Sequence, residues 1–114
     1  MKRNELLDRP ITFHRGFTRH TKSTTASLML SYACGLPAGE KDADGWFCLT
    51  AKDWEGETGL TLYEQQGARK VLRSLYDQDG NQVWQEELRE VPSKLFFRVD
   101  VDALWNLLSG DEGG

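Results

Sequence analysis

The stretch TAKDWEGETGLTLYEQQGARKVLRSL, residues 50–75, predicts two short helices joined by a tight turn. Thr50 can cap the first helix, because Asp53 lies three residues later and can reach back to the Thr50 amide. Gly59 suits the left-handed backbone position at which such a helix ends. The first helix is therefore expected over residues 51–58.

The second helix, expected over residues 62–75, has a clearer start signal and two distinct faces. Thr61 and Glu64 have the spacing of a capping box. At about 100° per residue, the face that should pack inward consists of Ala68, Val71, Leu72 and Leu75. The opposite, polar face has Arg69 at its margin and consists of Tyr63, Gln66, Lys70 and Arg73. This polar face is the candidate functional surface.

The remaining segments are expected to support and flank this helix pair. An uncharged, apolar helix is predicted over residues 21–32 and should be buried. Strands are predicted at residues 46–49, 83–88 and 94–99, the last two forming a β-hairpin. A final helix begins near Asp100 and should dock through one face, consisting of Val101, Leu104, Trp105 and Leu108. This order of elements is that of a winged helix-turn-helix, an α+β fold that is mostly α, here with a C-terminal helix and an N-terminal arm.

The chain length of 114 residues predicts a single domain with two differing ends. Residues 1–21 are interpreted as a basic N-terminal arm, irregular or with a short strand, that Ile11, Phe13 and Phe17 pin to the core. Residues 22–108 are expected to form the winged helix-turn-helix domain. Residues 109–114, SGDEGG, are expected to be a flexible tail.

The net charge of −4 opposes nucleic-acid binding, because attraction to phosphates supplies much of the affinity of such proteins. The charge is unevenly distributed, however. The first 22 residues contain six basic and two acidic side chains, whereas residues 40–58 contain two basic and six acidic ones. A solvated surface of mixed charge is the ordinary interpretation. A local basic face within an acidic protein is the alternative.

Several other classes of protein are disfavoured by the sequence. No run of about 18 apolar residues occurs, and the first ten residues lack an apolar signal-peptide core. Cys34 and Cys48 are expected to be buried thiols in a reducing cytoplasm. His14 and His20 have no metal-site spacing, and no nucleophile or phosphate-loop motif is present. We therefore expect a cytoplasmic protein that is not an enzyme, with no membrane contact, cofactor, metal or catalytic residue.

Side chains suited to DNA recognition are concentrated on the second helix of the pair. Arg and Lys pair with guanine, Gln pairs with adenine, and a major groove admits one helix. On this helix the candidate contacts are Tyr63, Gln65, Gln66, Arg69, Lys70 and Arg73. Further candidates are Arg89 and Lys94, which flank the loop of the hairpin, and Arg15, Arg19 and Lys22 in and just after the arm. The structural alternative is the solvated side of an amphipathic helix.

Part of the chain, residues 13–108, resembles winged-helix proteins of bacteriophages and related mobile elements. The most telling segments are GWF, DWEGETGL, YEQQGARKVL and VPSKLFFRV, beginning at residues 45, 53, 63 and 91. The resemblance implies a winged-helix fold and a role in replication initiation or replisome organisation. The chain departs from these proteins in the predicted hairpin, which would be the wing: acidic side chains lie in and beside it, namely Glu86, Glu87 and Glu90.

Two functions of different classes follow. The first is a duplex-DNA-binding protein, acting as a replication accessory or initiation factor or as a transcriptional regulator, as a homodimer. The second is a protein–protein interaction module that recognises replication proteins or a second copy of itself without binding DNA. The second is favoured by the net charge and by the four tryptophans, Trp46, Trp54, Trp84 and Trp105.

Overall fold

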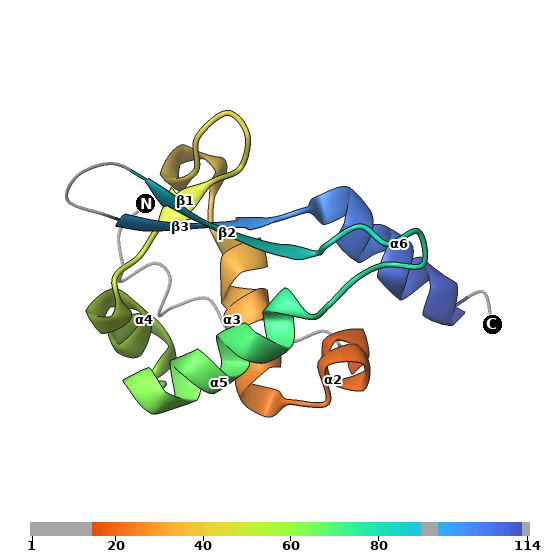
Figure 1. Ribbon diagram of the computed structural model, residues 1–114, viewed down its shortest axis with the longest axis horizontal. Coiled ribbons are helices and arrows are strands. Elements are labelled where there is room, and N and C mark those ends of the chain that lie inside the picture. Colours follow the sequence, from red (N-terminus) through yellow and green to blue (C-terminus); the bar gives the residue numbers. More distant parts are fainter. Residues whose placement is uncertain (1–14, 90–93, 113–114) are drawn as a thin grey trace.

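The computed structural model describes residues 15–89 and 94–112, which form five α-helices and a three-stranded sheet (Figure 1). The helices are α2 (Arg15–Thr21), α3 (Thr24–Gly35), α4 (Ala51–Thr58), α5 (Leu62–Arg73) and α6 (Val101–Glu112). The strands are β1 (Phe47–Cys48), β2 (Trp84–Arg89) and β3 (Lys94–Val99), and a 3-10 turn η1 covers Ala38–Glu40. The fold is α+β and mostly helical.

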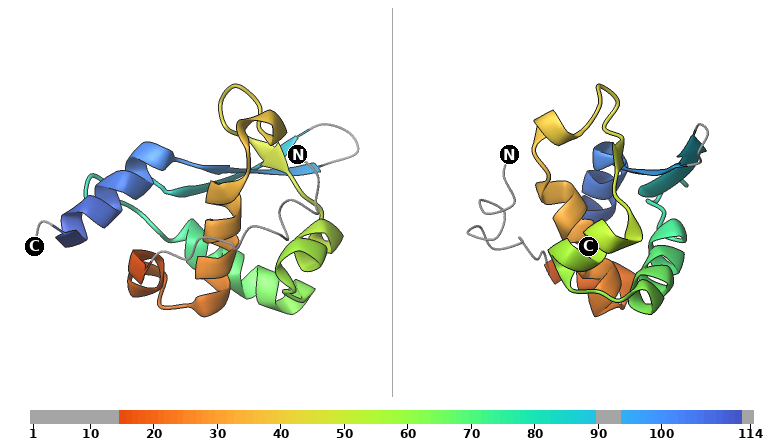
Figure 2. Two further views of the ribbon diagram at one scale, coloured as in Figure 1. Left: turned by 180° about the vertical axis from the view of Figure 1, so that it is seen from behind. Right: turned by 90° about the vertical axis from the view of Figure 1, so that its left-hand side faces the viewer.

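The sheet is antiparallel with β3 at its centre, in the order β1-β3-β2. Phe47 of β1 lies opposite Phe97 of β3, and Trp84 of β2 lies opposite Val99. Helices α3, α4 and α5 lie together on one side of the sheet, and α6 extends from the far end of β3 (Figures 1 and 2). The predicted hairpin is therefore present, and β1 joins it from a distant part of the sequence.

Trp54 of α4 is at the centre of the core. Its ring lies 5.5 Å from Tyr32 and 5.5 Å from Phe97 in edge-to-face contacts. Phe47 and Trp84 each lie 6.2 Å from it, measured between ring centroids. These rings come from α3, β1, α4, β2 and β3, so one aromatic cluster joins the helix pair to the sheet.

The helix pair α4–α5 has the predicted turn and caps. The Thr50 hydroxyl accepts from the Asp53 amide at 3.0 Å, and Asp53 accepts from the Thr50 amide at 3.0 Å. Thr61 and Glu64 form the same reciprocal pair at 3.2 and 3.0 Å. Gly59 has a φ of 79°, the left-handed conformation that ends α4. The predicted capping boxes and glycine turn are confirmed.

The start of the chain differs from the prediction. Residues 15–21, assigned to an irregular arm, form helix α2, in which Phe17 is buried against the core. Helix α3 begins at Thr24 and continues to Gly35, three residues beyond the predicted end. Its N-cap is Ser23, whose side chain accepts from the Ala26 amide at 3.1 Å. The arm prediction for residues 1–14 lies outside the described residues.

Helix α6 docks through a face that only partly matches the predicted one: Leu104 is buried and Leu108 is partly buried against the core, as predicted. Ala103, Leu104 and Leu107 are buried, whereas Val101 and Trp105 are 66% and 69% exposed. The helix also continues to Glu112, so the prediction of a flexible tail is wrong for residues 109–112. Residues 113–114 lie outside the described part.

The two cysteines differ from the prediction as well. The residues Cys34 and Cys48 are both free and exposed, so the expectation that they are buried is wrong, although burial of its sulfur raises the pKa of the Cys34 thiol to about 11. Within the described ranges, no helix has the length and apolar composition that crossing a membrane requires.

Candidate nucleic-acid interface

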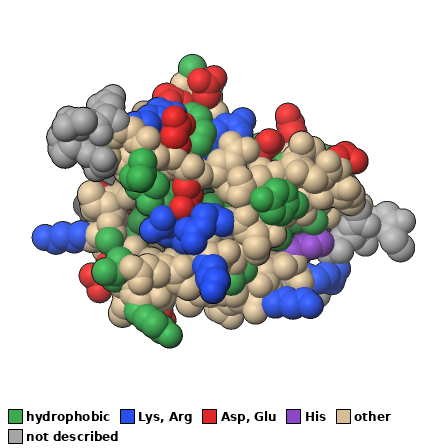
Figure 3. Space-filling view, in the orientation of Figure 1, with side chains coloured by type: hydrophobic (Ala, Val, Ile, Leu, Met, Phe, Trp, Pro, Cys, Tyr) green, Lys and Arg blue, Asp and Glu red, His purple; other side chains and the backbone are tan. Residues whose placement is uncertain are grey.

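The outward face of α5 carries the polar side chains that the helical period assigns to it. Gln66, Lys70 and Arg73 are exposed, and Tyr63 near the start of the helix is 85% exposed. Lys and Arg side chains gather at the middle of the molecular face seen in Figure 3, over α5 and β2, around an acidic side chain. The face is therefore solvent-accessible and carries both signs of charge.

Glu86 of β2 accepts hydrogen bonds from Arg69 and Arg73 of α5. Arg69 donates to both carboxylate oxygens of Glu86, from Nε and Nη2, at 2.9 and 2.9 Å. Arg73 donates from Nη1 at 3.2 Å, and Trp84 donates from its indole nitrogen at 2.9 Å. Four hydrogen bonds thus converge on one carboxylate and join α5 to the sheet.

The electrostatics of Glu86 follow from this arrangement. Burial acts to raise the pKa of Glu86, but hydrogen bonds from Arg69 and Trp84 outweigh it, and the pKa lies below its usual value. Glu86 is therefore ionised at neutral pH and compensates one of the positive charges of the cluster. Arg69, Lys70 and Arg73 together with Glu86 retain a surplus of two positive charges.

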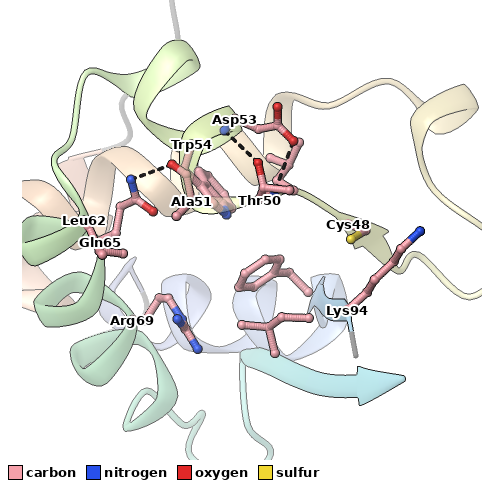
Figure 4. A pocket seen from close by; sticks show the side chains of 12 residues that line it. Cys48, Thr50, Ala51, Asp53, Trp54, Leu62, Gln65, Arg69 and Lys94 are labelled. Carbon is pink, nitrogen blue, oxygen red and sulfur yellow. Dashed lines mark hydrogen bonds between the residues drawn. The ribbon is translucent and has the colours of Figure 1, made fainter. Parts of the chain in front are cut away.

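Gln65 is a correction to the candidate set. It is 3% exposed, and its amide nitrogen donates to the carbonyls of Ala51 at 3.0 Å and Leu60 at 2.9 Å. Figure 4 shows the bond that joins Gln65 to Ala51. Gln65 thus fastens α5 to α4 and is not available to DNA. Its position three residues before Ala68 and seven before Leu72 places it on the buried face, a signal that the sequence contained.

The hairpin residues have unequal roles. The guanidinium of Arg89 lies 4.5 Å from the Phe96 ring centre and 4.9 Å from that of Trp46. It also pairs with Glu87 at 3.3 Å and with Asp42 at 3.7 Å, so it is engaged within the protein. Lys94, opposite Arg89 in the register, is exposed. The loop residues 90–93, including Glu90, lie outside the described ranges.

The basic residues of the predicted arm lie on and after α2. Arg19 and Lys22 are exposed, and α2 packs against α3 and α6. Arg15 begins α2, and its side chain is outside the described part. Figure 3 shows the basic side chains over α2 as a group separate from those over α5, with neutral surface between them. The structure thus presents two basic groups on this face.

Within residues 15–89 and 94–112, no cluster of three or more His, Cys, Asp or Glu side chains could hold a metal ion. A second dense polar network is a turn closed by Asp77, which accepts from the amides of Asp79 and Asn81 and from the side chains of Asn81 and Asn106. These contacts give Asp77 a structural role.

Comparisons of the chain with protein-family models, with curated proteins and with solved structures give no match. The assignment of a function therefore rests on the geometry of the described residues.

Proposed function

We propose that this chain is a winged helix-turn-helix protein that binds duplex DNA, with α5 in the major groove. Three features support the proposal. From α3 onward the element order is helix, strand, helix pair, hairpin and helix, and the sheet order is β1-β3-β2. Helix α5 follows a tight glycine turn, and its outward face is polar and exposed. A second helix presented in this way is the recognition element of helix-turn-helix proteins.

The observation that carries the proposal is the fixed position of the two arginines on α5. Glu86 engages two donors of Arg69 and one of Arg73, while a guanidinium has five N–H donors. Both groups therefore keep donors for phosphate or for a guanine edge. Because Glu86 already orders these side chains, less conformational entropy is lost when DNA binds.

The proposal assigns a role to each exposed residue of α5. Lys70 and Arg73 contact phosphates or guanine edges, and Gln66 contacts adenine. Tyr63, at the start of the helix, reaches the phosphate backbone. Arg69 lies at the margin of the outward face of α5, where Glu86 holds it against β2. Arg89 serves the packing of the hairpin, and contacts from Lys94, Arg15, Arg19 and Lys22 stay predictions.

The experiment is to replace Lys70 and Arg73 together by Ala and to measure affinity for duplex DNA. We expect a loss of at least about thirtyfold, because two charged contacts of about 1–3 kcal/mol each are removed. Circular dichroism should show an unchanged fold, since both side chains are exposed. Lys41→Ala, a change in the loop between η1 and β1, is the matched control and should bind as the wild type does. Equal affinity of the double variant and this control would contradict the proposal.

A second candidate function is protein–protein interaction, and one observation favours it. Val101 and Trp105 lie exposed on α6, and Leu88 is exposed on β2. Exposed apolar side chains at adjacent turns of a helix are suited to a partner surface. Under this alternative the chain self-associates or recruits a replication protein. Sedimentation of the wild type and of Trp105→Gln tests it, because substitution of a residue central to such an interface should weaken association.

A further inference from the structure

A pocket of about 430 Å³ lies between the start of α4, the start of α5 and strand β3 (Figure 4). Its walls come from four elements, since Cys48 of β1 also contributes. The volume is within the range of sites that bind small molecules. Two of the candidate DNA contacts, Arg69 and Lys94, line this pocket, and the other candidates on the outward face of α5 do not.

The indole nitrogen of Trp54 is the unusual group in the pocket wall. Trp54 is 1% exposed, and its Nε1 has no hydrogen-bond partner among the described residues. By contrast, Trp84 donates its Nε1–H to Glu86. Figure 4 shows the Trp54 nitrogen on the pocket side of the ring. A buried donor without an acceptor costs folding free energy, so its presence calls for an explanation.

The pocket lining carries two cationic side chains and one carboxylate, and one of the cations, Arg69, is already paired with Glu86. Thr50 and Ala51 begin α4 at the pocket wall, which places the positive end of the helix dipole there. Arg69 and Lys94 add two cationic side chains to the wall and rim. The carboxylate of Asp53 also lines the pocket, where it accepts from the Thr50 amide as part of the capping box.

Apart from the amide of Gln65, the rest of the lining is apolar. Leu49, Leu62, Leu95 and Phe97 line the pocket, and Leu62 is exposed at its edge. A ligand that carries a carboxylate on an apolar body would therefore match both parts of the wall.

We propose that this pocket binds a small organic acid with an aromatic body. Its carboxylate accepts a hydrogen bond from Trp54 Nε1 near the start of α4, and its ring lies against Leu62 and Leu95. Less than 1 Å² of the Trp54 nitrogen is accessible, so binding must shift the indole or Phe97 beside it. Because of that shift, the NMR signal of the Trp54 indole N–H should report ligand binding directly.

The test uses 3-phenylpropanoate and 2-naphthoate as probes, with 3-phenylpropanol as the uncharged match to the first. Indole N–H signals of the ¹⁵N-labelled full chain are followed during titration, without DNA, and Trp54→Phe assigns the Trp54 signal. Alkylation of Cys48, which lines the pocket, is measured in parallel.

We expect at least one acid to move the Trp54 signal and to slow alkylation of Cys48. The alcohol should bind at least about tenfold more weakly than 3-phenylpropanoate, because it lacks the charge. Since Trp54→Phe alters the core, Leu62→Asp at the exposed edge provides a second variant. It should weaken binding at least about tenfold by placing a like charge at the pocket.

Leu88→Asp, a change at an exposed leucine of β2 that does not line the pocket, should bind the acids as the wild type does. The proposal is overturned if neither acid moves the Trp54 signal up to its solubility limit. It is equally overturned if acid and alcohol bind alike, or if Leu62→Asp and Leu88→Asp do not differ. Because no DNA is present in these titrations, their outcome does not depend on whether the protein binds DNA.

Discussion

Arg69 and Glu86 form a two-pronged ion pair, with N–O distances of 2.9 and 2.9 Å, that joins α5 to β2. The side chain of Glu86 is 9% exposed and that of Arg69 is 25% exposed, so the pair is largely shielded from solvent. A bidentate pair of this kind fixes both position and orientation of a guanidinium. The pair therefore connects the stability of the fold to the charge of the proposed DNA surface.

Replacing Glu86 by Gln should destabilise the protein by about 1–3 kcal/mol, because Arg69 and Trp84 lose a charged acceptor in a partly buried site. The free energy of unfolding in urea, followed by tryptophan fluorescence, measures this. Glu87→Gln is the matched control on the same strand, where the carboxylate is 50% exposed. It should change stability by less than about 0.5 kcal/mol. Equal effects of the two variants would show that the pair contributes little.

Replacing Gln65 by Leu should also cost about 1–3 kcal/mol, because the carbonyls of Ala51 and Leu60 lose their shared donor. Thermal and urea unfolding provide the measurement. Gln66→Ala, at the exposed neighbouring position, should be within about 0.5 kcal/mol of the wild type. A stable Gln65→Leu variant with reduced DNA affinity would contradict the structural role and restore Gln65 as a contact.

The carboxyl group of Asp77 should make the stability of the fold sensitive to acid. Its hydrogen bond from Asn106, followed by that from the Asn81 amide, lowers the pKa of Asp77 to about 2. A carboxyl whose pKa is lower in the folded state than in the unfolded state contributes stability above the unfolded value. That contribution is lost as the pH falls from about 4, near the unfolded pKa, through the folded value.

Substitution of Asp77 by Asn should therefore flatten the fall of the melting temperature between about pH 4 and about pH 2. At neutral pH the variant should be less stable than the wild type, because a neutral side-chain amide has one acceptor oxygen in place of two charged ones. Asp44→Asn is the control, since its carboxylate takes no part in this turn network. An Asp77→Asn profile parallel to that of the wild type would refute the role assigned to the carboxylate.

Features that depend on neighbouring residues could be predicted from the sequence. The Thr50 and Thr61 caps and the Gly59 turn depend on side chains within three or four residues, so their signals are local. Strand β3 and its pairing with β2 likewise follow from two adjacent apolar runs. The helical period also places Gln65 on the buried face, although its amide side chain alone favours the interpretation as a DNA contact.

Features that depend on tertiary contacts could not be predicted. The pairing of Arg69 with Glu86 joins residues 17 apart, through the packing of α5 on β2. The face of α6 depends on how that helix leaves β3, and the apolar spacing of Val101 and Trp105 did not reveal it. Helix α2 is held by the burial of Phe17 more than by its own sequence period.

Duplex-DNA binding through α5 is best tested by the dependence of affinity on salt concentration. Each phosphate contact should contribute a slope of about −0.9 to log K against log salt concentration. We predict a clearly negative slope for the wild type, and a slope shallower by about one to two after replacement of Lys70 and Arg73 by Ala. A slope near zero, or one unchanged in the double variant, would contradict binding through this helix.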